Sequence, residues 1–276
     1  ITYDNLSIAL DTLILYTYYY MTTLQAIILG IIEGFAEFLP ISSTGHLILA
    51  SFLLGIPNTD ALKSFEIAIQ LGAILAVFLF YFKKFLDVEI LKKLFVAFLP
   101  TGVLGFTLYK IIKGYLIGNM YIVVIALFVG GILMLVAENW YKKNNIENKT
   151  IKSINDMSYM DALKLGLFQS IAMIPGVSRS GATIIGGLIM GIPRSILAEF
   201  TFLLAVPTMA AATGYDILKN YKIFSLDEIQ TIAVGFFTSF IVAIVVVKWL
   251  LSYIKQHDFK IFAWYRIALS VLFALV

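Results

Sequence analysis

Cysteine is absent from this 276-residue chain, which excludes disulfides, a thiolate metal site and a redox role. Charge is also scarce. Charged residues make up 13% of the chain, and the net charge of +3 is too small to indicate a nucleic-acid partner. Hydrophobic residues supply 61%, well above the share in soluble domains. This balance predicts an integral membrane protein without a separate soluble domain.

The first twenty residues carry no signal-peptide pattern, because no charged segment precedes an A-x-A-like cleavage site. The chain begins at Ile1, and Met21 opens a segment that would serve as a natural start. Residues 1–20 are an N-terminal extension that is either an extra helix or an upstream addition, and we assign it no function.

The hydrophobic runs fall into two length classes. Runs of spanning length occur at 65–82, 91–110, 120–140, 196–214, 229–252 and 261–276. Shorter runs at 24–39, 44–56, 160–174 and 181–192 are too short to cross. Pro40 and Pro175 interrupt the two short pairs, with Ser42 and Ser178 placed to cap the next helix. The expected fold is all-α, with about six full transmembrane helices and two re-entrant helical hairpins.

The two hairpins repeat each other at an offset of 136 residues. Residues 24–57 and 160–193 align without a gap and are identical at ten of 34 positions. Three full spans separate the hairpins, and an odd number reverses orientation, so the repeats should be inverted and interlocked. We predict a first repeat at 21–140 with its hairpin at 24–56, a linker at 141–158, and a second repeat at 159–276 with its hairpin at 160–192.

Lysines are unequally divided between the two sets of loops. Segments 83–93, 141–164 and 248–260 carry twelve lysines, whereas the opposite set of loops carries five. The positive-inside rule then places the loops at 83–93 and 141–158 in the cytoplasm and the loop at 110–119 outside. The first hairpin would open from the outer face and the second from the inner face.

Glu33 and Glu37 stand one helical turn apart on one face of the first hairpin. Two carboxylates at membrane depth repel each other and are poorly solvated, which favours an intervening hard cation such as Mg²⁺. The alternative is a structural pair that faces a water-filled cavity or bonds to nearby backbone. Glu66 and Gln70, one turn apart on the next span, are interpreted as polar interhelical contacts.

The segment Ser42-Ser43-Thr44-Gly45-His46 follows the first break, and the Ser42 hydroxyl is a candidate donor to a substrate phosphate. With Ser42 as the cap, Ser43 and His46 would be neighbours in the first turn, a pairing suited to an activated serine nucleophile. An imidazole can also attack phosphorus directly, so His46 is a second candidate nucleophile. The alternative is a serine cluster that only caps the helix. His257, in a charged loop, is interpreted as a solvated residue.

The matching segment of the second hairpin reads PGVSRSGAT, residues 175–183. It offers a second helix N-terminus, hydroxyl donors at Ser178, Ser180 and Thr183, and Arg179, whose planar fork matches a phosphate. The alternative for Arg179 is a structural pair with a carboxylate such as Glu37.

Together the hairpins would bring two carboxylates, serine, histidine, arginine and two helix N-termini to one place. That set suits phosphoryl transfer on a membrane substrate. A carrier or flippase for polyprenyl phosphate is the main alternative, because inverted repeats with half-helices are typical of transporters. A lipid-binding scaffold without turnover is the third. The Ser43 and His46 pair favours the enzyme, since transport needs no nucleophile.

The motifs ExxxEFLPISSTGH and PGVSRSGAT resemble the two signatures of the undecaprenyl-pyrophosphate phosphatase family, also known as bacitracin-resistance proteins. The resemblance runs from about Met21 to the C-terminal YRIALSVLFAL segment. It implies hydrolysis of C55 polyprenyl pyrophosphate to the monophosphate carrier lipid of cell-wall synthesis, with Mg²⁺ or Ca²⁺.

By motif position, the resemblance assigns catalysis to Glu33, Glu37, Ser43, His46 and Arg179, with Ser178 and Thr183 as supporting donors. The expected location is the bacterial plasma (inner) membrane, with the active site reached from the periplasmic side. The expected partners are the lipid substrate, the bilayer and a second copy of the chain in a homodimer, but not nucleic acid.

Overall fold

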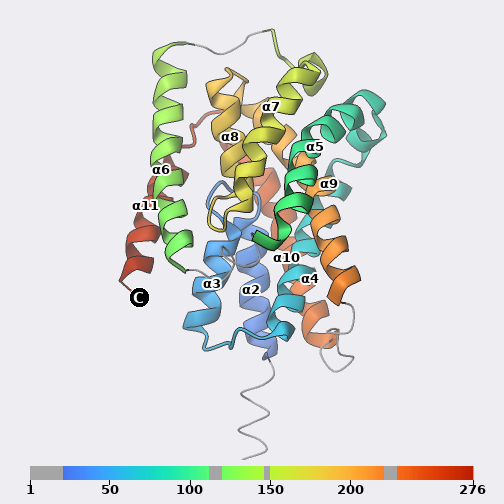
Figure 1. Ribbon diagram of the computed structural model, residues 1–276, viewed down its shortest axis with the longest axis vertical. Helices are drawn as coiled ribbons and strands as arrows, with labels where there is room; N and C mark the ends of the chain where they lie inside the picture. Colours follow the sequence, from blue (N-terminus) through green and yellow to red (C-terminus); the bar gives the residue numbers. More distant parts are fainter. Residues whose placement is uncertain (1–20, 112–119, 146–149, 221–228, 276) are drawn as a thin grey trace, which may run out of the picture.

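The computed structural model describes residues 21–111, 120–145, 150–220 and 229–275, and in these ranges the secondary structure is entirely helical (Figure 1). The predicted N-terminal extension and most of the predicted outer loop at 110–119 lie outside the described residues. The α-helices are α2 (Thr23–Ala36), α3 (Ser43–Leu53), α4 (Asp60–Phe80), α5 (Val88–Ile111), α6 (Met120–Lys143), α7 (Tyr159–Ser170), α8 (Arg179–Ile189), α9 (Arg194–Asn220), α10 (Ile229–Tyr253) and α11 (Lys260–Ala274).

Five helices are long and apolar enough to cross a membrane: α4, α5, α6, α9 and α10. The sixth expected span, at 261–276, corresponds to α11, whose 15 residues reach about 22 Å at the α-helical rise. This is less than the roughly 30 Å of a bilayer core. The all-α membrane class is confirmed, with five full spans and a shorter terminal helix in the described residues.

The short helices form two hairpins that enter the bundle from opposite ends. In Figure 1, α2 and α3 occupy the lower half and α7 and α8 the upper half, so that their breaks meet near the middle. Capping boxes start α2 at Thr22 and Gln25 and α7 at Ser158 and Asp161, which are equivalent positions of the two repeats. The two hairpins therefore begin with the same kind of capping box at equivalent positions of the two repeats.

Each hairpin packs against a long helix of the other repeat. Helix α2 lies against α10, and its counterpart α7 lies against α5. A Cβ at Gly30 would fall 2.7 Å from the carbonyl oxygen of Gly235, and one at Gly166 would overlap the backbone of Ala97. These equivalent glycines allow the backbones to approach closely, as small residues do between membrane helices. This exchange of partners interlocks the repeats.

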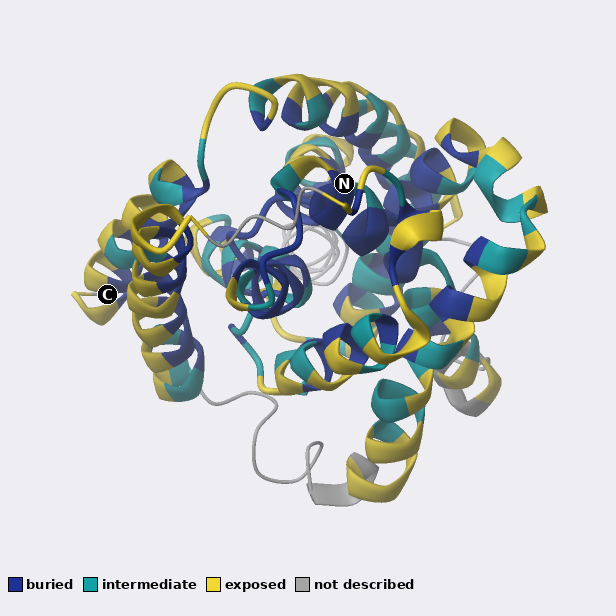
Figure 2. Cartoon of the chain, turned by 90° about the horizontal axis from the view of Figure 1, so that it is seen from above, coloured by how far each residue is buried: buried dark blue, intermediate teal, exposed yellow. Residues whose placement is uncertain are grey.

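The outer surface of the bundle is apolar, and its centre contains the buried polar groups. Figure 2 shows the exposed positions along the outside of the long helices and the buried positions toward the centre. Exposed side chains include Phe106 at 78%, Tyr121 at 81% and Phe95 at 61%. A surface of this kind suits hydrocarbon rather than water.

The segment that joins the repeats is anchored to the bundle. Lys93 of α5, which is 2% exposed, donates to the carbonyl oxygens of Ile154 and Asn155 at 3.3 and 2.8 Å. Hydrogen bonds from the backbone of Lys152 and from Ser153 lower the pKa of Asp156, so that this carboxylate stays ionised and holds the turn closed.

Candidate active site

The two hairpin breaks contact each other directly. The Ser180 hydroxyl donates to the carbonyl oxygen of Leu39 at 2.9 Å, and the Ser178 and Ser180 hydroxyls lie 3.0 Å apart. The first helices end at Ala36 and Ser170, and the second helices begin after the capping residues Ser42 and Ser178. Each break is therefore a short irregular stretch that contains a proline. Membrane-depth backbone of this kind is tolerated only where protein or a cavity surrounds it.

Glu37 is the point where the two repeats converge. Its Oε2 accepts a hydrogen bond from the Ser43 hydroxyl at 2.6 Å, and its Oε1 accepts one from an Arg179 terminal nitrogen at 3.2 Å. The other terminal nitrogen of Arg179 donates to the carbonyl oxygen of Thr201 at 3.0 Å. Ser43 and Arg179 are equivalent positions of the repeats, so one carboxylate joins a hydroxyl and a guanidinium related by the internal symmetry.

The expected pairing of Ser43 with His46 is wrong in this structure. The hydroxyl of Ser43 contacts Glu37, whereas His46 Nδ1 lies 2.7 Å from the Ser42 carbonyl oxygen and Nε2 lies 2.7 Å from the Tyr265 hydroxyl. A carbonyl only accepts, so Nδ1 carries a proton, and Nε2 of the neutral ring accepts from Tyr265. The ring also stacks on Tyr265 at an interplanar angle of 7°. Both imidazole nitrogens are thus engaged away from Ser43.

The four predicted hydroxyl donors separate into two kinds. Ser42 and Ser178 cap α3 and α8 through the backbone N–H groups three residues ahead, at 3.4 and 3.1 Å, and both line the central cavity. Ser180 and Thr183 are fully buried. Ser180 bonds to the first hairpin, and Thr183 donates to the Arg179 carbonyl oxygen at 2.9 Å, so these two support the second hairpin instead of facing a ligand.

Glu33 is fully buried, and neither of its carboxylate oxygens has a hydrogen-bond partner within the described residues. An uncompensated carboxylate at this depth is expensive, and a hard cation held by carboxylate oxygens would offset the cost. Glu37, one turn further along α2, retains free lone pairs beside its two hydrogen bonds. No cluster of three or more acidic or imidazole side chains that could hold a metal ion occurs in the described ranges.

A cavity of about 170 Å³ lies between the two breaks. Both hairpins line it, together with one residue of α4 and one of α9. The lining residues are Glu37, Ser42, Ser43, Thr44, Gln70, Ala172, Pro175, Gly176, Val177, Ser178, Arg179 and Met209. Gln70, which the sequence suggested to be an interhelical contact, is therefore part of the site wall. His46 and Glu33 do not line the cavity.

Arg266 of α11 is a residue that the sequence analysis missed. It is 1% exposed and donates to four backbone carbonyls. Two of these belong to Pro40 and Gly176, at 3.3 Å each, which are equivalent positions in the two hairpin breaks. Arg266 therefore ties both breaks to α6 and α11. An arginine inside the apolar run 261–276 is the signal that would have found it.

Residues 26–272 match the family described as bacitracin resistance protein BacA. The chain is 52% identical over 255 residues to a protein of Aquifex aeolicus named undecaprenyl-diphosphatase, covering 92% of this chain and 98% of that protein. A protein of the same name from Sulfurihydrogenibium is 54% identical with coverages of 92% and 99%, and one from Persephonella marina is 52% identical with the same coverages. The chain belongs to the BacA family of bacitracin resistance proteins.

Proposed function

We propose that this multi-pass membrane protein hydrolyses undecaprenyl (C55) pyrophosphate to undecaprenyl phosphate and inorganic phosphate. The observation that carries the proposal is the contact of Ser43 and Arg179 with the same carboxylate at the wall of a cavity deep in the bundle. Membership of the family and the names of the relatives support the choice of substrate. The reaction recycles the carrier lipid of cell-wall polymers and gives resistance to bacitracin.

Glu37 is placed to accept the proton of Ser43. As the Ser43 oxygen forms a bond to the terminal phosphorus, the bond from that phosphorus to the bridging oxygen breaks, and undecaprenyl phosphate leaves with its electron pair. Water then attacks the phosphoserine and releases phosphate, with Glu37 returning the proton to Ser43. The geometry favours Ser43 over His46 as the nucleophile, because both ring nitrogens of His46 are engaged elsewhere.

Arg179 and the two helix N-termini supply donors for the phosphate oxygens. Arg179 is held at 12% side-chain exposure by Glu37 and Thr201, so its fork is fixed before substrate arrives. The capped N-termini of α3 and α8 direct the positive ends of their dipoles toward the cavity. Transport would use such an anion site but needs no nucleophile, so the hydroxyl paired with a carboxylate favours hydrolysis.

Glu33 and Glu37 would hold the Mg²⁺ or Ca²⁺. When bound, the cation neutralises phosphate oxygens and so stabilises the charge that builds up in the transition state. The unpartnered oxygens of Glu33 support this assignment. The excess of lysine in the loops at the end of the bundle that carries the linker 141–158 supports a cytoplasmic position for that end. In the plasma membrane, the active site would then be reached from the outer face.

Phosphate release from C55 pyrophosphate by the purified protein in detergent tests the proposal. Hydrolysis should require a divalent cation and stop in chelator, and Ser43→Ala should reduce the rate to near background. Ser51→Ala is the matched control, because Ser51 lies on the same helix, is buried and has no hydrogen-bond partner in the described structure. Equal rates for the two variants would contradict the assignment of the nucleophile. No hydrolysis by the unmodified protein would contradict the function.

A further inference from the structure

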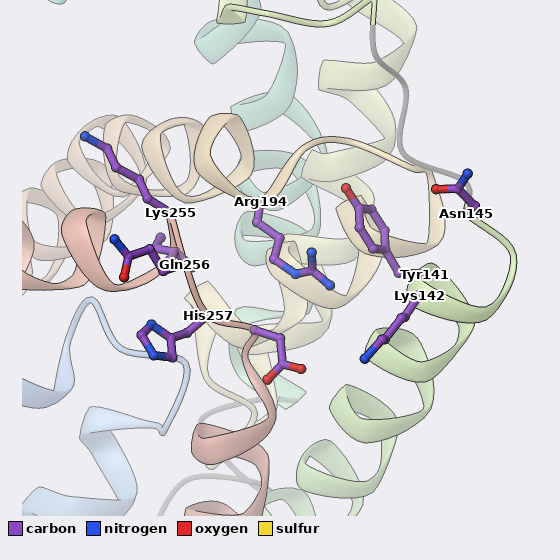
Figure 3. Close-up of a pocket in the computed structure, with 9 residues that line it drawn as sticks. Tyr141, Lys142, Asn145, Arg194, Lys255, Gln256 and His257 are labelled. Atoms are coloured by element: carbon purple, nitrogen blue, oxygen red, sulfur yellow. The ribbon is translucent and has the colours of Figure 1, made fainter.

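A second and larger cavity, of about 380 Å³, lies at the linker end of the bundle (Figure 3). The end of α6, the start of α9 and the turn between α10 and α11 form its walls. The lining residues are Tyr141, Lys142, Asn145, Arg194, Ile254, Lys255, Gln256, His257 and Asp258. It shares no residue with the cavity between the hairpin breaks, and its volume lies in the range of small-ligand sites.

The walls of this cavity carry more positive than negative charge. Lys142 and Lys255 form no ion pair with any residue that the structure describes. Arg194 pairs with the buried Glu138 through Nε and one terminal nitrogen, at 3.1 and 2.5 Å. Its other terminal nitrogen makes no hydrogen bond in the described ranges, and the guanidinium carbon lies 4.4 Å from the centre of the Tyr141 ring. The one acidic lining residue, Asp258, lies 3.9 Å from Lys260 and also interacts electrostatically with Arg194.

Polar donors complete the wall. His257 Nδ1 lies 3.0 Å from the Tyr253 carbonyl oxygen and must be the donor in that bond, which leaves Nε2 available. The side chains of Asn145 and Gln256 make no hydrogen bond with other described residues. Figure 3 shows Arg194 between the two lysines, with Gln256 and His257 on the Lys255 side. A fixed guanidinium flanked by two flexible ammonium groups is an arrangement that suits a phosphate group.

The position of the cavity along the bundle matches the headgroup level of a bilayer. All three tryptophans of the chain are close in sequence to residues that line the cavity, and all three are exposed: Trp140 at 53%, Trp249 at 46% and Trp264 at 61%. Each is within six residues of a lining residue, on α6, α10 and α11 respectively. Exposed tryptophans collect at the interface between hydrocarbon and water. The mouth of the cavity is therefore at the depth where lipid phosphates lie.

We propose that this cavity binds the phosphate headgroup of an anionic phospholipid, with the acyl chains along the apolar surface of α6 and α11. Lys142 and Lys255 supply the attraction, and the free nitrogen of Arg194 supplies a directed hydrogen bond. Basic pockets between helices on the side with the lysine excess are the usual form of such sites. The bound lipid would join the ends of α6, α9 and α10 at the level of the linker. The proposal does not depend on the hydrolytic function.

Titration of dansyl-labelled phosphatidylglycerol into the purified protein in neutral-detergent micelles tests this proposal. Energy transfer from the adjacent tryptophans reports binding. The double variant Lys142→Gln, Lys255→Gln should bind about 30-fold more weakly, since each lysine near the surface contributes roughly fivefold. The matched control is Lys92→Gln, Lys164→Gln, which removes the same charge from exposed lysines at the same end that line neither cavity.

The result expected is weak binding by the cavity variant, unchanged binding by the control variant, and little transfer to dansyl-labelled phosphatidylcholine. Equal losses in the two double variants would overturn the proposal in favour of general surface attraction. Displacement of the lipid by millimolar inorganic phosphate would overturn it as well, because it would assign the cavity to free phosphate. Hydrolysis of C55 pyrophosphate in detergent should be the same in both double variants.

Discussion

A substitution at Gly130 of α6 tests the role of Arg266, because Gly130 lies directly against the Arg266 guanidinium. A Cβ at position 130 would overlap the Arg266 terminal nitrogen that donates to the carbonyl oxygens of Ala126 and Gly176. Gly130→Ala should therefore displace the guanidinium without removing its charge. Gly214 of α9 is the matched control, because nothing lies within 4 Å of a Cβ there.

The expected loss follows from the hydrogen bonds. Two bonds from a charged donor contribute about 1.5–3 kcal/mol each, and the better helix propensity of alanine offsets about 1 kcal/mol. Gly130→Ala should thus lower the free energy of unfolding by about 2–5 kcal/mol, whereas Gly214→Ala should be neutral or slightly stabilising. Thermal unfolding in detergent, followed by tryptophan fluorescence, should show a fall in Tm of several degrees for Gly130→Ala alone.

Kinetics separate positioning from simple destabilisation. Below its Tm, Gly130→Ala should have a lower kcat with a nearly unchanged KM, because the two breaks that carry Ser43 and Arg179 are no longer fixed relative to each other. A merely structural role would leave the kcat of the folded fraction intact. Identical Tm and kcat for the two alanine variants would refute the role that we assign to Arg266.

Three further predictions concern the site itself. Arg179→Lys keeps the charge but not the planar fork, so it should insert normally and lose about 10²–10³ in kcat, measured by phosphate release; near-normal turnover would contradict this. Glu33→Gln should raise the Mg²⁺ concentration needed for half-maximal rate by roughly 10–100-fold, and an unchanged requirement would remove Glu33 from the cation site. Tyr265→Phe should free Nε2 of His46, visible as a shifted imidazole titration by NMR, with at most a tenfold loss in rate; an unshifted titration would contradict the contact.

The break in each hydrophobic pair and the 136-residue offset were enough to predict the hairpins and their inverted arrangement. The hairpins could be predicted because polar residues interrupt the apolar runs at equivalent positions in both halves of the sequence. From the sequence, Arg179 could either bind a phosphate or pair with a carboxylate such as Glu37, and the sequence did not decide between them. The structure contains this contact, with 3.2 Å between a terminal nitrogen of Arg179 and Oε1 of Glu37.

The partner of Ser43 could not be found from local spacing. Helix geometry makes His46 its neighbour, but the first residue of a helix that follows a tight break can also face the end of the previous helix, and Ser43 faces Glu37. The role of Arg266 depends on four carbonyls from three distant segments, which no spacing rule joins. The apolar run at 261–276 was counted as a full span from its hydrophobicity, but α11 at Lys260–Ala274 is shorter than a bilayer core is thick.

The proposed hydrolysis requires the two repeats to form one catalytic centre through Glu37 and Arg179. A double-mutant cycle with Glu37→Gln and Arg179→Lys tests it most directly, with kcat for C55 pyrophosphate as the readout. If the two residues act as one unit, the double variant should be about as slow as the slower single variant, a loss on the order of 10²–10³. If the losses instead multiply, to on the order of 10⁴ or more, the residues act independently and the account is contradicted.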